Sequence, residues 1–235
     1  MAKGDLMRLM PKLVVTLALL GCATPPQAPG SPAGQPFHAI GTEPFWGVSV
    51  ADGRILHDPS DGEDVSVPAP ARQETRNGYR WRTGRITVEV TSRPCSDGMS
   101  NNVYPADVKV FVNGTRLLGC GGYDFTGELA GSAWRIVNVN LTDVSGDHYR
   151  LEFTGDRITG RAGCNSLSGP YSRRDRTTLA VGPVTATRMA CPEPRMEHER
   201  AVLEMFTEPV RLSYSEPDTL AIGNELGGIV LRRIR

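Results

Sequence analysis

Short strand-like runs separated by turn residues constrain the fold of this chain most strongly. From Phe37 onward, runs of β-forming residues are interrupted about every ten residues by Gly, Pro, Asn or Asp, which is typical of antiparallel β structure. In the clearest run, Ile86, Val88 and Val90 alternate with polar neighbours and therefore lie on one face of a strand. The 26 Gly and 18 Pro residues also argue against a helical bundle.

Turn chemistry predicts individual hairpins. Asn113-Gly114, between the strand-like residues 108–112 and 115–118, is the strongest signal because Asn and Gly accept the positive φ angles of a type I′ turn. Asp52-Gly53 and Gly155-Asp156 mark two further turns. Residues 163–171 are rich in Gly and small polar residues, and we expect them to form a loop.

One helix is expected, over residues 194–206, with Pro194 in its first turn and Pro209 after its end. The positions that recur on one side at three- and four-residue spacing are Met196, Glu199, Val202, Leu203 and Phe206. This pattern predicts that Val202, Leu203 and Phe206 cover one face or mouth of a sheet.

The expected fold class is mainly β, with two antiparallel β domains. The first spans residues 37–127 and the second residues 129–235, which contains the single packed helix. Trp46 and Trp134 are interpreted as core anchors of the two domains.

The first 21 residues have the features of a secretory signal peptide. Lys3, Arg8 and Lys12 precede an apolar run over residues 13–20, which as a helix rises about 12 Å and is too short for a bilayer core of about 30 Å. The run ends in Leu-Leu-Gly-Cys, which resembles the lipobox of bacterial lipoproteins. The resemblance implies cleavage before Cys22 and acylation of its thiol and amino group. The alternative is an ordinary secretory leader with an unacylated Cys22.

Residues 22–36 are expected to be the lipidated Cys22 followed by a linker, because residues 23–36 contain five prolines and no charge. By the lipobox resemblance, Ala23 in place of Asp favours the periplasmic face of the outer membrane; the alternative is the outer leaflet of the inner membrane. The protein is thus expected to associate with the membrane through its N-terminal lipid anchor.

The four other cysteines are Cys95, Cys120, Cys164 and Cys191, an even number in an oxidising compartment. Three pairings are possible. Because each expected domain contains two cysteines, the simplest assignment is Cys95–Cys120 and Cys164–Cys191. Alternatively, Cys164 is a nucleophile with His148 or His198 as its base, which a disulfide would abolish. No Cys-x-x-Cys occurs and the four His are scattered, so we expect no metal site and no cofactor.

The second half contains a specific set of motifs: TGRAGCN at residues 159–165, GPY at 169–171 and TRMAC at 187–191. Together they are similar to the META domain of the HslJ family over about residues 129–235. The resemblance implies a compact antiparallel β domain with one packed helix, and an association with stress responses and resistance in bacterial envelopes. Residues 37 to about 122 resemble an uncharacterised lipoprotein domain found ahead of META domains.

Two interpretations of these motifs stay open. In the first, Asn165 bonds the amides of its own loop, which a Cys164–Cys191 disulfide braces against the helix. In the second, Asn165, Tyr171 and Arg188 line a ligand pocket.

The sequence lacks a catalytic constellation: Gly-x-Ser-x-Gly and His-Glu-x-x-His are both absent. His198, with Glu197 and Glu199, is interpreted as part of a solvated helix face. A hydrolase that uses paired carboxylates is the alternative, and its candidate residues are Glu43, Asp97 and Asp107.

We therefore expect a non-enzymatic envelope lipoprotein, related to stress or resistance, that binds a small molecule, a cell-wall component or an envelope protein. A third class is an assembly or inhibitor module that acts through exposed strands. Nucleic-acid binding is disfavoured, because 26 basic and 26 acidic residues give no net charge and the basic residues are spread along the chain.

Overall fold

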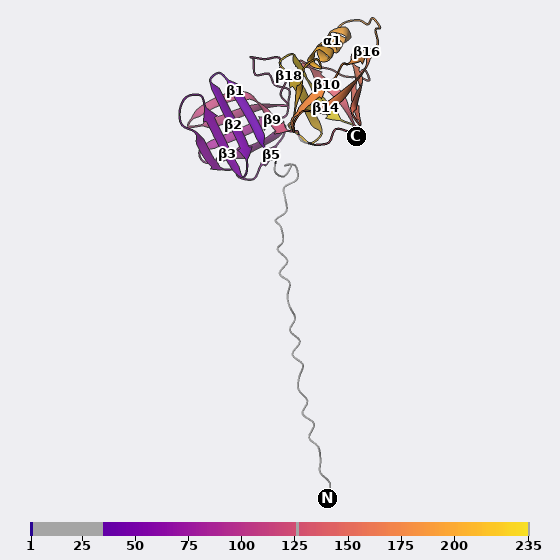
Figure 1. The fold of residues 1–235 in the computed structure, drawn as a ribbon. Coiled ribbons are helices and arrows are strands. Elements are labelled where there is room, and N and C mark those ends of the chain that lie inside the picture. The colour runs from indigo at the N-terminus through magenta and orange to yellow at the C-terminus, as the bar shows by residue number, and fades with distance from the viewer. Residues whose placement is uncertain (2–34, 126, 235) are drawn as a thin grey trace.

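The computed structural model describes Met1 and residues 35–125 and 127–234. The rest of the expected leader, Cys22 and most of the expected linker lie outside these residues. The described chain consists mainly of antiparallel strands with one helix (Figure 1), which confirms the mainly β prediction. Among the described residues, no helix has both the length and the apolar character that a membrane span requires.

The first β unit is one antiparallel sheet in the order β4-β3-β2-β1-β9-β8-β7-β6-β5. Its strands are β1 (Phe37–Thr42), β2 (Phe45–Ala51), β3 (Arg54–Pro59), β4 (Val65–Pro68), β5 (Gln73–Thr75), β6 (Gly78–Arg82), β7 (Ile86–Thr91), β8 (Ala106–Val112) and β9 (Thr115–Asp124). Asn113 and Gly114 have φ angles of 51° and 78°, so the strongest predicted hairpin turn connects β8 to β9 as expected.

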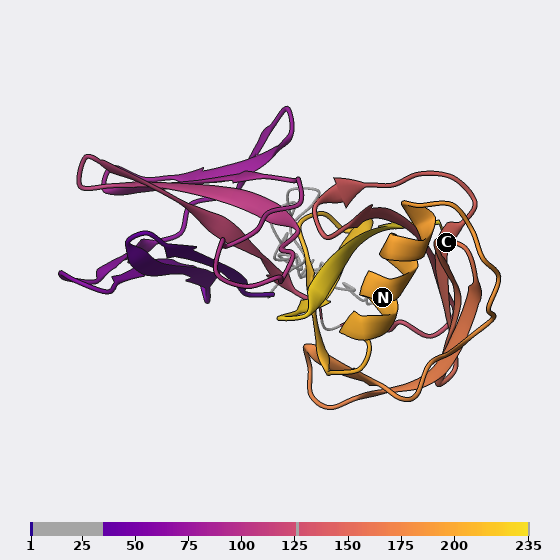
Figure 2. The ribbon, with the colours of Figure 1, turned by 90° about the horizontal axis from the view of Figure 1, so that it is seen from above.

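The sheet curls so that its two halves form layers around one hydrophobic core (Figure 2). Ile86, Val88 and Val90 all point into this core, as their alternation predicts. Trp46 is 4% exposed and belongs to the same core. Period-2 patterning therefore identified the buried face of the strands correctly.

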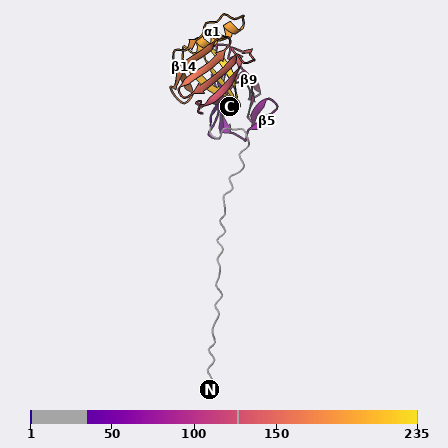
Figure 3. The ribbon, with the colours of Figure 1, turned by 90° about the vertical axis from the view of Figure 1, so that its right-hand side faces the viewer.

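The second β unit is an antiparallel barrel in the order β10-β12-β13-β14-β15-β17-β18-β19, which the pairing of β19 with β10 closes. Its strands are β10 (Ser132–Val139), β11 (Thr142–Asp143), β12 (Tyr149–Thr154), β13 (Arg157–Ala162), β14 (Ser166–Arg173), β15 (Thr178–Val181), β16 (Thr185–Ala186), β17 (Val210–Tyr214), β18 (Thr219–Asn224) and β19 (Gly227–Arg233). The short strands β11 and β16 pair with β10 and β14. Figure 3 shows the strands of this barrel from the side, with α1 at one end.

Helix α1 (Arg195–Met205) lies across one end of the barrel (Figure 2). Val202 and Phe206 are buried in the barrel core, as predicted. The predicted role of Leu203 is wrong in part, because Leu203 is only half-buried and Met205 occupies the core position instead. The helix is therefore rotated slightly from the face that apolar spacing alone predicts.

The prediction of a loop over residues 163–171 is wrong for most of that segment. Strand β14 begins at Ser166, pairs with β13 through Leu167 opposite Gly160, and continues to Arg173. Weak β propensity is overridden here because the neighbouring strands β13 and β15 pair with β14 on its two edges.

The two β units are joined by the end of strand β9, which pairs on both edges. Tyr123 lies opposite Phe37 of β1 on one edge and opposite Tyr214 of β17 on the other. The rings of Tyr123 and Tyr214 stack with centroids 5.3 Å apart, and the N–H of Phe125 donates to the carbonyl of Leu212 at 3.2 Å. Backbone pairing and aromatic contact thus connect the first unit to the barrel.

The long connection between β7 and β8 is held in a defined shape. Cys95 forms a disulfide with Cys120, with Cα atoms 5.7 Å apart. The carboxylate of Asp97 accepts hydrogen bonds from the N–H groups of Met99 and Ser100 at 3.0 and 2.9 Å. Burial works to raise the pKa of Asp97, but these hydrogen bonds outweigh it and hold the pKa below its usual value.

This connection presents Val103 to the barrel. Val103 is 2% exposed and packs against Ala221 and Val230. A Cβ at Gly228 would lie 2.6 Å from the Cβ of Val103, so the absence of a side chain at Gly228 leaves room for this contact. Val103 therefore forms a second, apolar connection between the two units.

Replacing Val103 with Asp is expected to separate the unfolding of the two units. A carboxylate without a partner is costly to bury, so the contact with the barrel should be lost while each core stays intact. Differential scanning calorimetry should then show a lowered first transition and two resolved transitions. Met99→Asp is the matched control, because Met99 lies in the same connection and is 68% exposed. An unchanged, single transition in Val103→Asp would contradict the proposed connection.

Candidate functional site

Asn165, the first of the three predicted ligand-binding residues, lies against the start of α1. Its backbone N–H and that of Cys164 donate to Glu199 Oε2 at 2.5 and 3.1 Å, and its Nδ2 donates to Oε1 at 2.9 Å. A Cβ at Gly163 would lie 2.2 Å from the carbonyl oxygen of Arg195, so glycine is needed for this close approach. The carboxylate of Glu199 thus holds the β13–β14 connection on the helix.

The remaining polar capacity of Asn165 is also used. Its Oδ1 accepts hydrogen bonds from Thr187 Oγ1 at 2.8 Å and from the N–H of Met189 at 2.7 Å, and its Nδ2 donates to the carbonyl of Met189 at 3.1 Å. Cys164 forms a disulfide with Cys191, with Cα atoms 6.1 Å apart. The geometry of Asn165 therefore favours the braced loop over the ligand pocket, because its amide is saturated.

Tyr171 and Arg188 do not join Asn165 in one cavity. The hydroxyl of Tyr171 donates to the carbonyl of Gly155 at 2.7 Å, and its ring packs edge-on against Phe153. Burial raises the pKa of the Tyr171 hydroxyl. Arg188 is exposed and lines an open groove beside α1, in which Asn165 takes part but Tyr171 does not.

The interpretation of His198 and Glu199 as a solvated helix face is wrong. His198 is 8% and Glu199 6% exposed, whereas Glu197 is exposed as expected. His198 Nδ1 shares a hydrogen bond of 2.8 Å with the hydroxyl of Tyr149. Both polar side chains are buried because each meets a partner from a distant strand or loop, which sequence spacing does not show.

The residues weighed for catalysis are engaged separately. The sulfur of Cys164 is in a disulfide and is not a free nucleophile. Asp97 caps its own connection, and Asp107 forms an ion pair with Arg93. The structure thus holds Asp97 and Asp107 with different partners, and nothing in these contacts assembles a pair of carboxylates.

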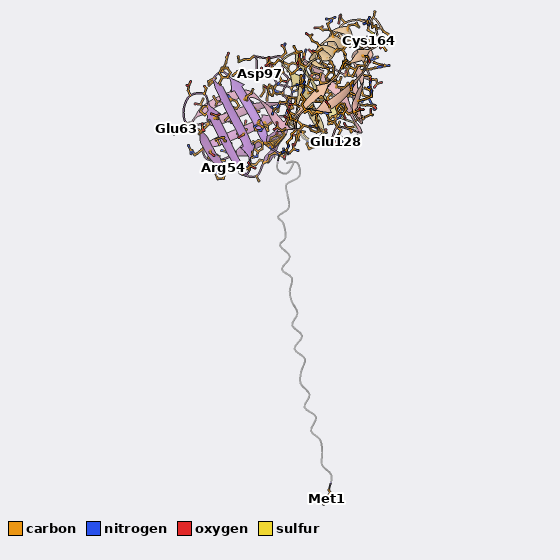
Figure 4. All side chains as sticks on the ribbon, in the orientation of Figure 1. Met1, Arg54, Glu63, Asp97, Glu128 and Cys164 are labelled. Atoms are coloured by element: carbon orange, nitrogen blue, oxygen red, sulfur yellow. A yellow bond between two sulfur atoms is a disulfide. The ribbon has the colours of Figure 1, made fainter. Side chains whose placement is uncertain are left out.

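A cavity of about 440 Å³ lies where the two β units meet. Strands β1 and β9, residues 102–104 and strand β17 form its walls, and in Figure 4 the labelled Asp97 marks the connection that contributes one of them. The polar groups in the lining are those of His38, Asn102, Tyr104, Asp124, Arg211 and Ser213. Its size and its place between two units are those of a small-molecule site.

One carboxylate organises the charges of this cavity. Asp124 Oδ1 accepts from Arg211 Nη2 at 2.6 Å, and Asp124 Oδ2 lies 3.7 Å from His38 Nε2. The side chain of Asp124 is 18% exposed, whereas those of Arg211 and His38 are 54% and 48% exposed. Most guanidinium N–H groups of Arg211 are therefore left for a ligand, since the contact with Asp124 uses only Nη2.

Tyr104 contributes a fixed hydroxyl at the cavity wall. It donates to Asp97 Oδ2 at 3.3 Å, and burial raises its pKa, so the phenol stays protonated near neutral pH. The lining combines the ion-paired Arg211 and Asp124 with an imidazole, hydroxyl groups and an amide, and the remaining N–H groups of Arg211 suit binding of a polar molecule with an anionic group. Sequence analysis missed this cavity because His38 and Arg211 come from different units and only the β9–β17 pairing brings them together.

His57 is a buried ionisable group in the first unit. It is 4% exposed, lies beside Trp46, and neither ring nitrogen has a hydrogen-bond partner in the described part of the chain. Burial lowers the pKa of His57, against the opposing effect of Asp58 and Asp64. The folded protein therefore holds His57 neutral.

Comparison with known proteins identifies a META domain at residues 127–233, which coincides with the barrel and its helix. A solved structure described as the NMR structure of the protein from Burkholderia xenovorans is similar over 46% of this chain and 85% of its own, with 22% identity and a TM-score of 0.38. No curated protein matches the chain.

Replacing Glu199 with Gln is expected to destabilise the second unit by about 2 kcal/mol. The three groups that bond to the Glu199 carboxylate are all donors. A glutamine amide has one acceptor oxygen, so its NH₂ group would face at least one of these donors. Urea denaturation measures the change. Glu197→Gln, on the exposed side of the same helix, is the control, and equal stability of the two variants would refute the bracing role.

Stability is expected to fall as the pH is lowered below about 6.5, the usual pKa of histidine in an unfolded chain. The depressed pKa of folded His57 means that the unfolded chain binds the proton first, so the contribution is complete above pH 6.5 and is lost as the pH falls toward the folded pKa. His57→Leu should flatten the difference in unfolding free energy between pH 7.5 and 5.5. A slope identical to that of the unmodified protein would exclude His57 as its source.

Proposed function

We propose that this chain, which carries a META domain at residues 127–233, is a non-enzymatic, lipid-anchored binding protein of the bacterial cell envelope. The observation that carries the proposal is the cavity of about 440 Å³ between the two β units, with Arg211 and His38 on either side of Asp124. Its ligand is a small polar molecule with a carboxylate or phosphate group.

The chemistry of the cavity supports binding. A guanidinium presents N–H groups in a planar fork that matches carboxylate and phosphate oxygens. The hydroxyl of Ser213 and the amide of Asn102 add neutral hydrogen-bonding groups, while Ile40 and Val103 supply apolar contact. Connections on two sides of the cavity keep these groups in place before a ligand arrives, which lowers the entropy cost of binding.

The absence of an enzymatic role is part of the proposal. The cavity lining has no cysteine thiol, because Cys120 is in a disulfide, and its carboxylate, Asp124, is bonded to Arg211. Neither Cys120 nor Asp124 therefore supplies a free nucleophile or base, and in this proposal Ser213 and His38 act as hydrogen-bonding groups for the ligand.

The location is proposed from the leader and the cysteines. Acylation of Cys22 would tether the folded units to a membrane through the linker, and the two disulfides suit an oxidising compartment. We place the protein at the periplasmic face of the outer membrane, with the outer leaflet of the inner membrane as the alternative. A stress or resistance role would follow from the ligand or the envelope partner that it holds.

A panel of small carboxylates and phosphomonoesters tests the proposal. At least one member should raise the melting temperature of the protein, and titration calorimetry should show binding that weakens tenfold or more in Arg211→Gln. Arg211→Lys should retain part of the affinity, because the charge is kept and the fork is lost. Arg116→Gln, an exposed arginine on the first unit, is the control. A panel without any shift, or equal binding by Arg211→Gln, would refute this site.

A further inference from the structure

A groove runs along helix α1 at the end of the barrel. Two adjoining hollows of about 890 and 650 Å³ lie between the helix and residues 181–190, and both are lined by Val184, Met196 and Leu203. Figure 1 shows β16 and α1 next to each other at this end of the barrel. Val184 and Leu203 pack on the barrel core but are only partly covered, so the core continues outward into an open apolar surface.

One wall of the groove is an open strand edge. Strand β16 pairs with β14, and no other strand pairs with β16 in residues 35–125 and 127–234. The N–H of Thr187 donates to the carbonyl of Ser166, so the backbone groups of Ala186, one residue earlier, point away from β14. A strand edge of this kind accepts an extended segment of another chain.

The groove also has a cation at one end. Arg188 follows β16, is exposed, and forms no ion pair or side-chain hydrogen bond with any residue that the structure describes. Of the acids that line the groove, Glu199 is already bonded to Asn165 and Cys164, and Glu204 lines the adjoining hollow together with Arg200 rather than the hollow that contains Arg188. The charge of Arg188 is thus available to a carboxylate of the occupant.

We propose that this groove binds an extended, acidic peptide segment of a partner protein. Its backbone pairs with Ala186, an apolar side chain lies between Val184 and Leu203, and a carboxylate meets Arg188. An acyl chain would fill the apolar surface but would leave the backbone groups of Ala186 without partners, so the open edge favours a peptide. The site is distinct from the cavity between the units and does not depend on its ligand.

The walls of the groove are set before the partner binds. Asn165 fixes Met189 on one wall and Glu199 on the other, and the Cys164–Cys191 disulfide closes the same loop. A prearranged groove loses little conformational entropy on binding, which suits recognition of a short segment.

The probe is a phage-displayed library of random heptapeptides, panned against the purified full chain. Enriched peptides should combine Asp or Glu with apolar residues. Each is then synthesised with a fluorescein label and titrated by fluorescence anisotropy. Affinity should fall tenfold or more in Ala186→Pro, which removes the N–H that points away from β14 and therefore breaks no hydrogen bond to β14. It should fall about threefold in Arg188→Gln, as for an exposed ion pair.

Arg174→Gln is the matched control for Arg188→Gln, since Arg174 is an exposed arginine on the same barrel outside the groove. If Ala186→Pro fails to fold by circular dichroism, Arg188→Gln and Leu203→Glu provide the comparison instead. Failure to enrich any peptide, or equal affinity in the groove variants and the control, would overturn the proposal. A competing result would also overturn the proposal. If lauric acid displaces the labelled peptide, and peptide affinity falls in Leu203→Glu but is unchanged in Arg188→Gln, the groove would be assigned to an acyl chain.

Discussion

The pairing of β9 on both edges is the interaction on which the arrangement of the two β units depends. The ladder between β8 and β9 ends at Gly121, which leaves one edge of Tyr123 and Asp124 open to β17 while β1 keeps the other. Backbone groups at such a position need partners when they are buried, and β17 supplies them. Because this pairing fixes β1 relative to β17, His38 and Arg211 meet the same carboxylate, that of Asp124.

A buried carboxylate has a comparable role in the barrel. Glu199 would be costly to bury alone, but three N–H donors from Cys164 and Asn165 satisfy it. Through Asn165 the network extends to Met189, so the segment after β16 stays at a fixed place beside α1. Asn165, one of the three residues that first suggested a binding site, therefore shapes a groove, and all of its side-chain hydrogen-bonding groups are used in doing so.

Two sequence-based interpretations were wrong for related reasons. The segment beginning at Ser166 looks like a loop because Gly and Ser have weak β propensity, yet β13, β15 and β16 supply its partners. His198 and Glu199 look solvated because they are polar, yet Tyr149 and Asn165 satisfy them inside the protein. The partners of His198 and Glu199 are distant in sequence, and the pairing on both edges of β14 outweighs its local propensity, so local pattern predicts neither result.

The sequence by itself determined the local features of this protein. The Asn113-Gly114 turn, the buried face of β7, the position of α1 and the motifs of the META domain follow from neighbouring residues, whose conformational preferences and spacing act over a few positions. Only the tertiary structure decided which polar side chains share a site. The cavity and the groove each join segments that strand register and barrel closure bring together, and register depends on contacts summed over whole sheets.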